Sequence, residues 1–121
     1  MKTRLRIVIA ALAIGALAIA AVPAQAGPPV KTQVKIASLG ADGGSGKVKS
    51  RNKKCLKRRT VSLKFVGEYG DVIVGKDRTN RHGAWAVHKS LTRHGIYYAT
   101  VKNKSVGKTK CARGSSKDRR F

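Results

Sequence analysis

Alternating apolar and polar side chains recur along this chain and predict β-strands. The clearest run covers residues 60–66, where Val61, Leu63 and Phe65 fall on one face of an extended segment and polar residues fall on the other. No apolar repeat with the period of an α-helix follows residue 26. Weaker alternation predicts further strands at residues 34–39, 47–50 and 72–75. The chain is therefore expected to be an all-β protein.

Residues 79–101 predict two strands that meet at a tight turn and close the core. Before the first strand, Asn80 and Gly83 supply turn chemistry, because an Asn side chain bonds its own backbone and Gly tolerates a positive φ. Trp85 and Val87 then fall on one face of the strand. The single tryptophan is therefore expected to fill the centre of the core.

The second strand of this pair follows Gly95. Tyr97, Ala99 and Val101 alternate there with residues that are also partly apolar, which is typical of a strand between two layers. The intervening loop contains Leu91, which is expected to anchor the loop over one end of the sheet.

Two segments without a strand pattern are expected to be flexible. Residues 40–46 are rich in glycine, but they lack a P-loop because Ala41 and Val48 stand where Gly and Ser or Thr are required. They also lack a calcium loop, because Asp42 is their only carboxylate. The polar tail is expected to fray. The predicted organisation is a signal peptide at residues 1–26, an extended segment with a linker at 27–45, a β-domain at 46–113 and a flexible tail at 114–121.

The first 26 residues have the three regions of a secretory signal peptide. Basic residues precede an apolar run at residues 7–22, and the small-residue site Ala24-Gln25-Ala26 follows it. The run is shorter than the ~20 residues of a membrane-spanning helix. We therefore expect a cleaved signal helix, a secreted protein that is extracellular or associated with the cell envelope, and no membrane span in the mature chain.

Cys55 and Cys111 are the only cysteines. In an oxidising compartment we expect them to form one intramolecular disulfide, with two free thiols or an intermolecular bridge as the alternatives. The bond would stabilise the fold by about 4 kcal/mol on the chain-entropy model. A single small domain gains from such bracing because its core is modest.

The charge balance is strongly basic, with 27 Lys and Arg against five Asp and Glu. Without the three basic residues of the signal, the mature chain carries a formal charge of +19. Such an excess favours association with polyanions. The disulfide would bring two basic segments together into one anion-binding patch, unless strand alternation places the charges on different faces. The predicted patch comprises Arg51, Lys53, Lys54, Lys57, Arg58, Arg59, Lys102, Lys104, Lys108, Lys110 and Arg113.

No catalytic or metal-binding motif is apparent. Glu68 and Asp71 lie near each other in a turn and are expected to be solvated. His82, His88 and His94 are spaced six residues apart, which matches no zinc motif. No serine lies in a nucleophile-elbow context. We therefore expect no enzyme activity, no cofactor and no metal.

Two short motifs carry a family resemblance: Thr79-Asn80-x-x-Gly83-x-Trp85-x-Val87 and Gly95-x-Tyr97-Tyr98-Ala99-x-Val101. They resemble the turn and strand of secreted bacterial carboxypeptidase-regulatory-like domains, which are transthyretin-like (prealbumin-like). The resemblance covers residues 46–111. It implies a small β-sandwich of about seven strands that serves as a non-catalytic accessory, adhesive or ligand-binding module. An immunoglobulin-like sandwich is the alternative fold.

These observations predict a secreted, single-domain, disulfide-braced module that acts by binding. The leading hypothesis is electrostatic association with an anionic polymer of the cell envelope or extracellular matrix. One alternative is a protein–protein interaction or inhibitory module whose charge serves only solubility. The other is non-specific nucleic-acid binding, which the shortage of aromatic residues outside the predicted core disfavours.

Overall fold

The computed structural model describes residues 27–121, so the predicted signal peptide and its helix lie outside the described residues. This part of the chain is all-β and contains no α-helix, and no helix in it is long and apolar enough to cross a membrane. The strands are β1 (Gln33–Gly40), β2 (Gly43–Lys49), β3 (Thr60–Gly67), β4 (Gly70–Arg78), β5 (Ala84–His88), β6 (Ile96–Val101), β7 (Lys104–Val106), β8 (Thr109–Cys111), β9 (Gly114–Ser115) and β10 (Arg119–Arg120). A short 3-10 helix, η2 (Lys53–Cys55), precedes β3.

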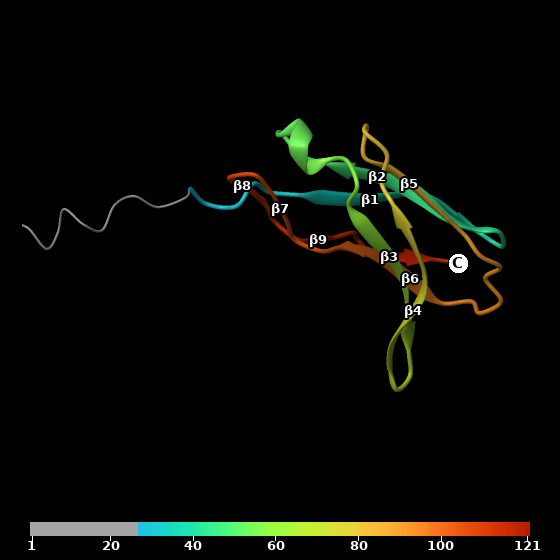
Figure 1. Cartoon of the computed structure of the whole chain (residues 1–121). Coiled ribbons are helices and arrows are strands. Elements are labelled where there is room, and N and C mark those ends of the chain that lie inside the picture. The colour runs from blue at the N-terminus through green and yellow to red at the C-terminus, as the bar shows by residue number, and fades with distance from the viewer. Residues whose placement is uncertain (1–26) are drawn as a thin grey trace, which may run out of the picture.

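The strands form antiparallel sheets (Figure 1). One sheet has the order β1-β2-β5, and a larger sheet has the order β10-β6-β3-β4 with β9 also paired to β6. The hairpin of β7 and β8 pairs only with itself, apart from an isolated bridge between Val30 and Cys111. Ten strands are present in residues 27–121, where about seven were expected, because the four short strands near the C-terminus carry little apolar alternation.

One core lies between the two main sheets. Trp85 on β5 and Leu63 on β3 belong to the same cluster of buried side chains, although these strands lie in different sheets. The predicted inward faces of β3 and β6 are confirmed, since Val61, Leu63 and the inward residues of β6 are buried and Phe65 packs partly buried against the core. The cluster comprises Val34, Ile36, Val48, Val61, Leu63, Trp85, Val87, Leu91, Tyr97, Ala99 and Val101.

The turn before Trp85 forms as predicted. The Asn80 side chain accepts hydrogen bonds from the backbone N–H groups of His82, at 2.8 Å, and Ala84, at 3.0 Å. Gly83 has a φ of +85°, and an added Cβ there would lie 2.4 Å from the Val48 carbonyl oxygen. The turn therefore requires both the amide and the glycine.

The expectation that the two strands of residues 79–101 meet at a turn is wrong. β5 pairs with β2 and β6 pairs with β3, so the segment between them crosses from one sheet to the other. Leu91 in this crossing is buried in the core, and its backbone N–H donates to the Ala41 carbonyl at 2.9 Å. Both strands have apolar inward faces, and each finds its partner in a different sheet.

The glycine-rich segment is part of a strand and not a linker. Residues 43–46 belong to β2, the central strand of its sheet, and only Ala41 and Asp42 form the turn after β1. A Cβ on Gly46 would lie 1.8 Å from the Lys35 carbonyl oxygen and 2.9 Å from the Trp85 ring. The glycines allow β2 to approach its neighbours closely, so the folded domain includes residues that were assigned to the linker.

The C-terminal segment is also ordered, against the prediction of a flexible tail. β9 and β10 pair with β6, and the Arg119 guanidinium donates to the Ile36 carbonyl at 2.6 Å. Phe121 packs against the core, and its backbone exchanges two hydrogen bonds of 2.9 Å with Gly95. Backbone pairing and one aromatic side chain hold this polar segment in place.

Candidate functional site

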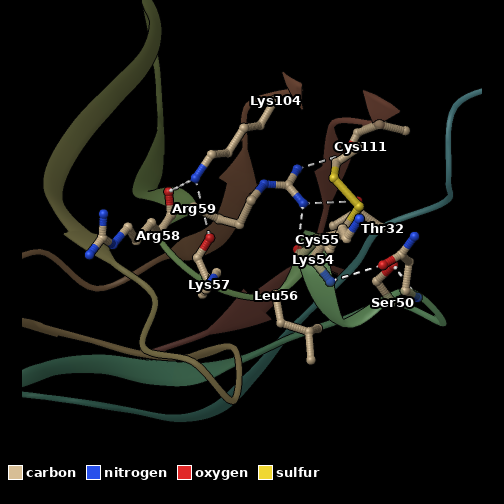
Figure 2. Close-up of a disulfide and its surroundings, with 12 residues drawn as sticks. Thr32, Ser50, Lys54, Cys55, Leu56, Lys57, Arg58, Arg59, Lys104 and Cys111 are labelled. Carbon is tan, nitrogen blue, oxygen red and sulfur yellow. Dashed lines mark hydrogen bonds between the residues drawn. A yellow bond between two sulfur atoms is a disulfide. The ribbon is translucent and has the colours of Figure 1, made fainter. Parts of the chain in front are cut away.

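The predicted disulfide between Cys55 and Cys111 is present, with the two Cα atoms 5.5 Å apart (Figure 2). Both cysteines are buried. The bond joins η2 to the end of β8 and therefore connects the basic segment 51–59 to the hairpin of β7 and β8. Two lysine-rich and arginine-rich segments that are far apart in the sequence are linked covalently.

The segment before Cys55 is shaped by a capping residue. The Asn52 side chain accepts a hydrogen bond of 2.9 Å from the Lys54 backbone N–H, which satisfies one free donor at the start of η2. Lys53 and Lys54 are exposed on this short helix. The cap holds the turn and leaves both ammonium groups in solvent.

Arg59 does not belong to the exposed patch that the sequence predicts. Its side chain is only 1% exposed, and burial lowers the pKa of its guanidinium. The guanidinium donates to three backbone carbonyls, those of Cys55 at 2.8 Å, Lys102 at 2.8 Å and Ala112 at 2.9 Å. These hydrogen bonds to carbonyl oxygens hold the guanidinium inside the protein, so it is unavailable to a ligand on the surface.

The surroundings of Arg59 extend to two further segments. A fourth hydrogen bond, of 3.2 Å, runs from its guanidinium to the Thr32 hydroxyl before β1. Its backbone N–H donates to the Thr79 hydroxyl at 2.8 Å, and that hydroxyl in turn donates to the Leu56 carbonyl. Arg59 thus connects five segments through hydrogen bonds. Two of these segments precede β1 and β3, and the other three follow β4, β6 and β8.

Lys104 lies among other cations on β7. Its ammonium donates to the backbone carbonyls of Arg58, at 3.0 Å, and Lys57, at 3.4 Å (Figure 2). Burial lowers the pKa of Lys104, and the charges of Arg59, Arg58, Arg78 and Lys57 lower it further. Several positive charges therefore converge on this point, and a bound anion would relieve their repulsion.

A groove of about 990 Å³ lies beside this point. Its floor includes outward positions of the larger sheet, where Thr100 on β6 pairs with Ser62 on β3 and with Ser115 on β9. Residues of the hairpin of β7 and β8 line it as well. None of the lining residues is acidic or aromatic. Its cations are Lys64, Lys76, Lys102, Lys104, Lys110 and Arg113. We call this hollow the basic groove.

A second hollow of about 300 Å³ shares part of this lining. It also contains Lys102 and Lys104, and it adds Arg58, Arg78 and, beneath them, the buried Arg59. No acidic side chain lines it either. The two hollows therefore form a continuous basic surface that extends from β9 to the segment before β3.

The predicted patch is assembled only in part. Five predicted residues line the two hollows at the surface, namely Arg58, Lys102, Lys104, Lys110 and Arg113. Lys57 contacts Lys104 through its carbonyl. Four others are exposed outside the lining: Arg51, Lys53, Lys54 and Lys108.

Sequence reasoning missed three cations of the surface. Lys64 lies on β3, and Lys76 and Arg78 lie on β4. Lys64 alternates with the buried residues of β3, so the period-2 pattern places it on the outer face. That pattern could have added the outward positions of the strands to the two basic segments.

The end of the same outer face holds a pair of polar side chains. The Tyr98 hydroxyl on β6 donates to the Asp71 carboxylate on β4, and this hydrogen bond raises the pKa of Tyr98. The Lys64 ammonium lies 5.9 Å from the centre of the Tyr98 ring. Within residues 27–121, no three His, Cys, Asp or Glu side chains come close enough together to hold a metal ion.

No family model, no curated protein and no solved structure matches this chain. The structure defines a small all-β protein with several antiparallel sheets and one disulfide. Its candidate site is the basic surface formed by the two hollows, and the prealbumin-like resemblance stays a prediction.

Proposed function

We propose that the protein is a non-catalytic binding module that holds an anionic polymer in the basic groove. The observation that carries the proposal is the gathering of cations from four strands and three connecting segments around hollows without a lining carboxylate. Unpaired like charges at close range destabilise a fold unless a ligand of opposite charge compensates them. A polyanion provides that compensation along its whole length.

The chemistry of the lining favours a flexible polymer without planar bases. Five of the six cations of the groove are lysines, which act as compact point charges and do not select planar, bidentate acceptors. Three hydroxyl residues, Ser62, Thr100 and Ser115, also line the floor. Proteins that bind single-stranded nucleic acid use aromatic side chains for stacking, and none lines this groove.

The proposal extends to the setting and the fold class of the module. We propose a secreted protein whose ligand is a polymer of the cell envelope or extracellular matrix, and the disulfide supports an oxidising compartment. We also propose a prealbumin-like β-sandwich, with an immunoglobulin-like sandwich as the alternative. The single core shared by two antiparallel sheets supports both.

The test is a charge reversal within the groove, Lys76→Glu, Lys102→Glu and Lys110→Glu, in the mature protein. All three side chains are exposed, so the fold should survive the changes. We expect the affinity for labelled long-chain inorganic polyphosphate to fall at least about tenfold at low salt. The slope of log K against log salt should shrink by about 2 to 3, because fewer counterions are released.

A matched control reverses the same number of charges away from both hollows, with Arg81→Glu, Lys89→Glu and Arg120→Glu. These side chains are also exposed and line neither hollow. We expect less than about a threefold change, because these side chains line neither hollow and salt screens exposed charges that do not contact the ligand. Equal losses in the two triple variants would overturn the groove as the binding site. Tighter binding to duplex DNA than to polyphosphate would favour the nucleic-acid alternative.

A second candidate function is protein–protein interaction, and one observation favours it. The hairpin of β3 and β4 projects from the body of the molecule (Figure 1). It exposes apolar side chains, with Val66 at 40%, Val72 at 48%, Ile73 at 50% and Tyr69 at 97%. If the groove variant retains full polyanion affinity, this hairpin becomes the leading candidate for the functional surface.

A further inference from the structure

A second group of lysines lies on the smaller sheet. Lys35 on β1 stands directly opposite Lys47 on β2, and Lys49 follows two residues later on the same face. All three are exposed and alternate with the buried residues Val34 and Val48. We call these three residues the lysine cluster of β1 and β2.

The cluster is electrostatically unfavourable in the free protein. Like charges directly opposite each other on antiparallel strands are destabilising. The positive charge of Lys35 is the main cause that lowers the pKa of Lys49, and Lys47 adds to it. The three ammonium groups therefore repel one another on the same face.

Protection of a sheet edge explains only part of this arrangement. Lysines on an edge strand prevent unwanted pairing with another chain, and Lys35 lies on the edge strand β1. Lys47 lies on the central strand β2 and is paired on both sides, with Lys35 and with Ala84, whereas Lys49 at the end of β2 is paired only with Gln33. Edge protection therefore does not explain Lys47, and binding of an anion would remove the repulsion.

The cluster and the floor of the basic groove lie on the outer faces of different sheets, although Lys35 on the edge strand also lines a separate hollow of about 540 Å³ with Ser115 of the groove. The inner faces of the two main sheets share one core, so their outer faces point away from each other (Figure 1). Ser62 and Thr100 of the groove floor belong to the larger sheet, and the cluster belongs to the smaller one. Two packed sheets lie about 10 Å apart, to which the side chains on both outer faces add. One polymer segment on the floor of the groove therefore does not contact Lys47 and Lys49, which line neither of these hollows.

We propose that the lysine cluster of β1 and β2 is a second anion-binding surface, which lets one protein molecule bridge two strands of anionic polymer. This inference rests on the proposed function of the groove. It adds a property that a single site lacks, because two opposed sites convert a binder into a cross-linker. The ligand at the second surface has the same chemistry, a chain of closely spaced phosphate, sulfate or carboxylate groups.

The experiment neutralises the cluster with Lys35→Gln, Lys47→Gln and Lys49→Gln and measures two quantities. Light scattering of the protein with long-chain inorganic polyphosphate reports bridging, and anisotropy of a labelled short polyphosphate reports binding to single sites. We expect the scattering to fall at least about fivefold. The affinity of the highest-affinity site should change by less than about threefold, because none of the three lysines lines the basic groove and salt screens exposed charges at a distance.

The matched control removes three charges elsewhere, with Arg81→Gln, Lys89→Gln and Arg120→Gln, and should scatter as the wild type does. Circular dichroism of each variant checks the fold. Unchanged scattering in the folded cluster variant, or an equal loss in the control, would overturn the bridging proposal while leaving the groove intact. Loss of the highest-affinity site in the cluster variant would instead place the primary site on β1 and β2, which contradicts the proposed function.

Discussion

At the scale of single residues, Arg59 is the most informative side chain. A cation without a carboxylate partner normally avoids the interior, because desolvation of a charge is expensive. Here three carbonyl oxygens and one hydroxyl accept hydrogen bonds from the two terminal nitrogens, while the buried Nε has no partner within residues 27–121. Arg is suited to this role because its planar group offers five donors in fixed directions. Arg59 therefore acts as a structural cross-link at the base of a surface that other cations form.

We predict that Arg59→Met lowers the free energy of unfolding by at least about 3 kcal/mol. The substitution keeps most of the side-chain volume but leaves several buried carbonyls without a donor, and each such group costs about 1–3 kcal/mol. Urea denaturation of the disulfide-intact protein measures the change. Arg58→Met at the neighbouring exposed position is the control, and a similar loss there would contradict the role assigned to Arg59.

The sequence contained a signal for this residue. Arg59 is in phase with Val61 and Leu63, the inward positions of β3, so continued alternation places it inside. Its basic neighbours nevertheless suggested a solvated run of charges. Sequence alone could not supply the carbonyls of Lys102 and Ala112, because they come from segments more than forty residues away.

At the scale of elements, the central strand β2 fits between its neighbours because several of its residues are glycines, which have no side chain. Gly43, Gly44 and Gly46 each face backbone or side-chain atoms within 3.3 Å of where a Cβ would stand. This close approach lets the Trp85 ring lie against the strand. Composition alone indicated a linker here, because glycine in a strand has no apolar pattern and its contacts are made by distant residues.

We predict that Gly46→Ala destabilises the protein by about 2 kcal/mol or more. The added Cβ would collide with the Lys35 carbonyl oxygen, and overpacking of this kind typically costs 1–3 kcal/mol. Gly40→Ala is the matched control, since no atom lies within 4 Å of a Cβ at that position. Thermal unfolding of both variants is the measurement, and equal melting temperatures would show that the strand tolerates the side chain.

The longer strands were easier to predict than the shorter ones. β6 buries every second residue, and β3 turns Val61, Leu63 and Phe65 toward the core, so apolar alternation located both strands and their inward faces. β9 and β10 are two residues long and are held by pairing with β6 and by the packing of Phe121. Backbone hydrogen bonds of that kind are independent of residue type, so no pattern in the sequence marks them.

At the scale of the whole molecule, the disulfide connects the core to the candidate surface. We predict that replacing both cysteines, Cys55→Ala with Cys111→Ala, lowers the free energy of unfolding by up to about 4 kcal/mol. Polyphosphate affinity should fall as well, because Lys104 and Lys110 on β7 and β8 would no longer be held beside Arg58. Denaturation and anisotropy measure the two effects. Unchanged affinity in a folded variant would mean that the hairpin keeps its position without the bond.

The positive net charge follows from the composition, but the positions of the charges on the surface differ from those that the sequence analysis predicted. The two segments near the cysteines supply only part of the basic groove, and strand residues such as Lys64 and Lys76 supply the rest. A further group lies on the opposite sheet. Both interpretations of the sequence therefore hold in part, since the disulfide concentrates some charges and alternation separates others.

The position of Cys111 also has a mechanical meaning. A polymer under tension at Lys104 and Lys110 would pull on a hairpin that pairs only with itself and touches Val30 through a single bridge. Hydrogen bonds contribute about 1 kcal/mol each and yield in sequence when a hairpin is peeled away. The bond to Cys55 passes the force to η2 through covalent atoms. Separation of the hairpin from the rest of the protein, starting at the end of β8, therefore stops at Cys111. The pulling force is then transmitted to the folded core.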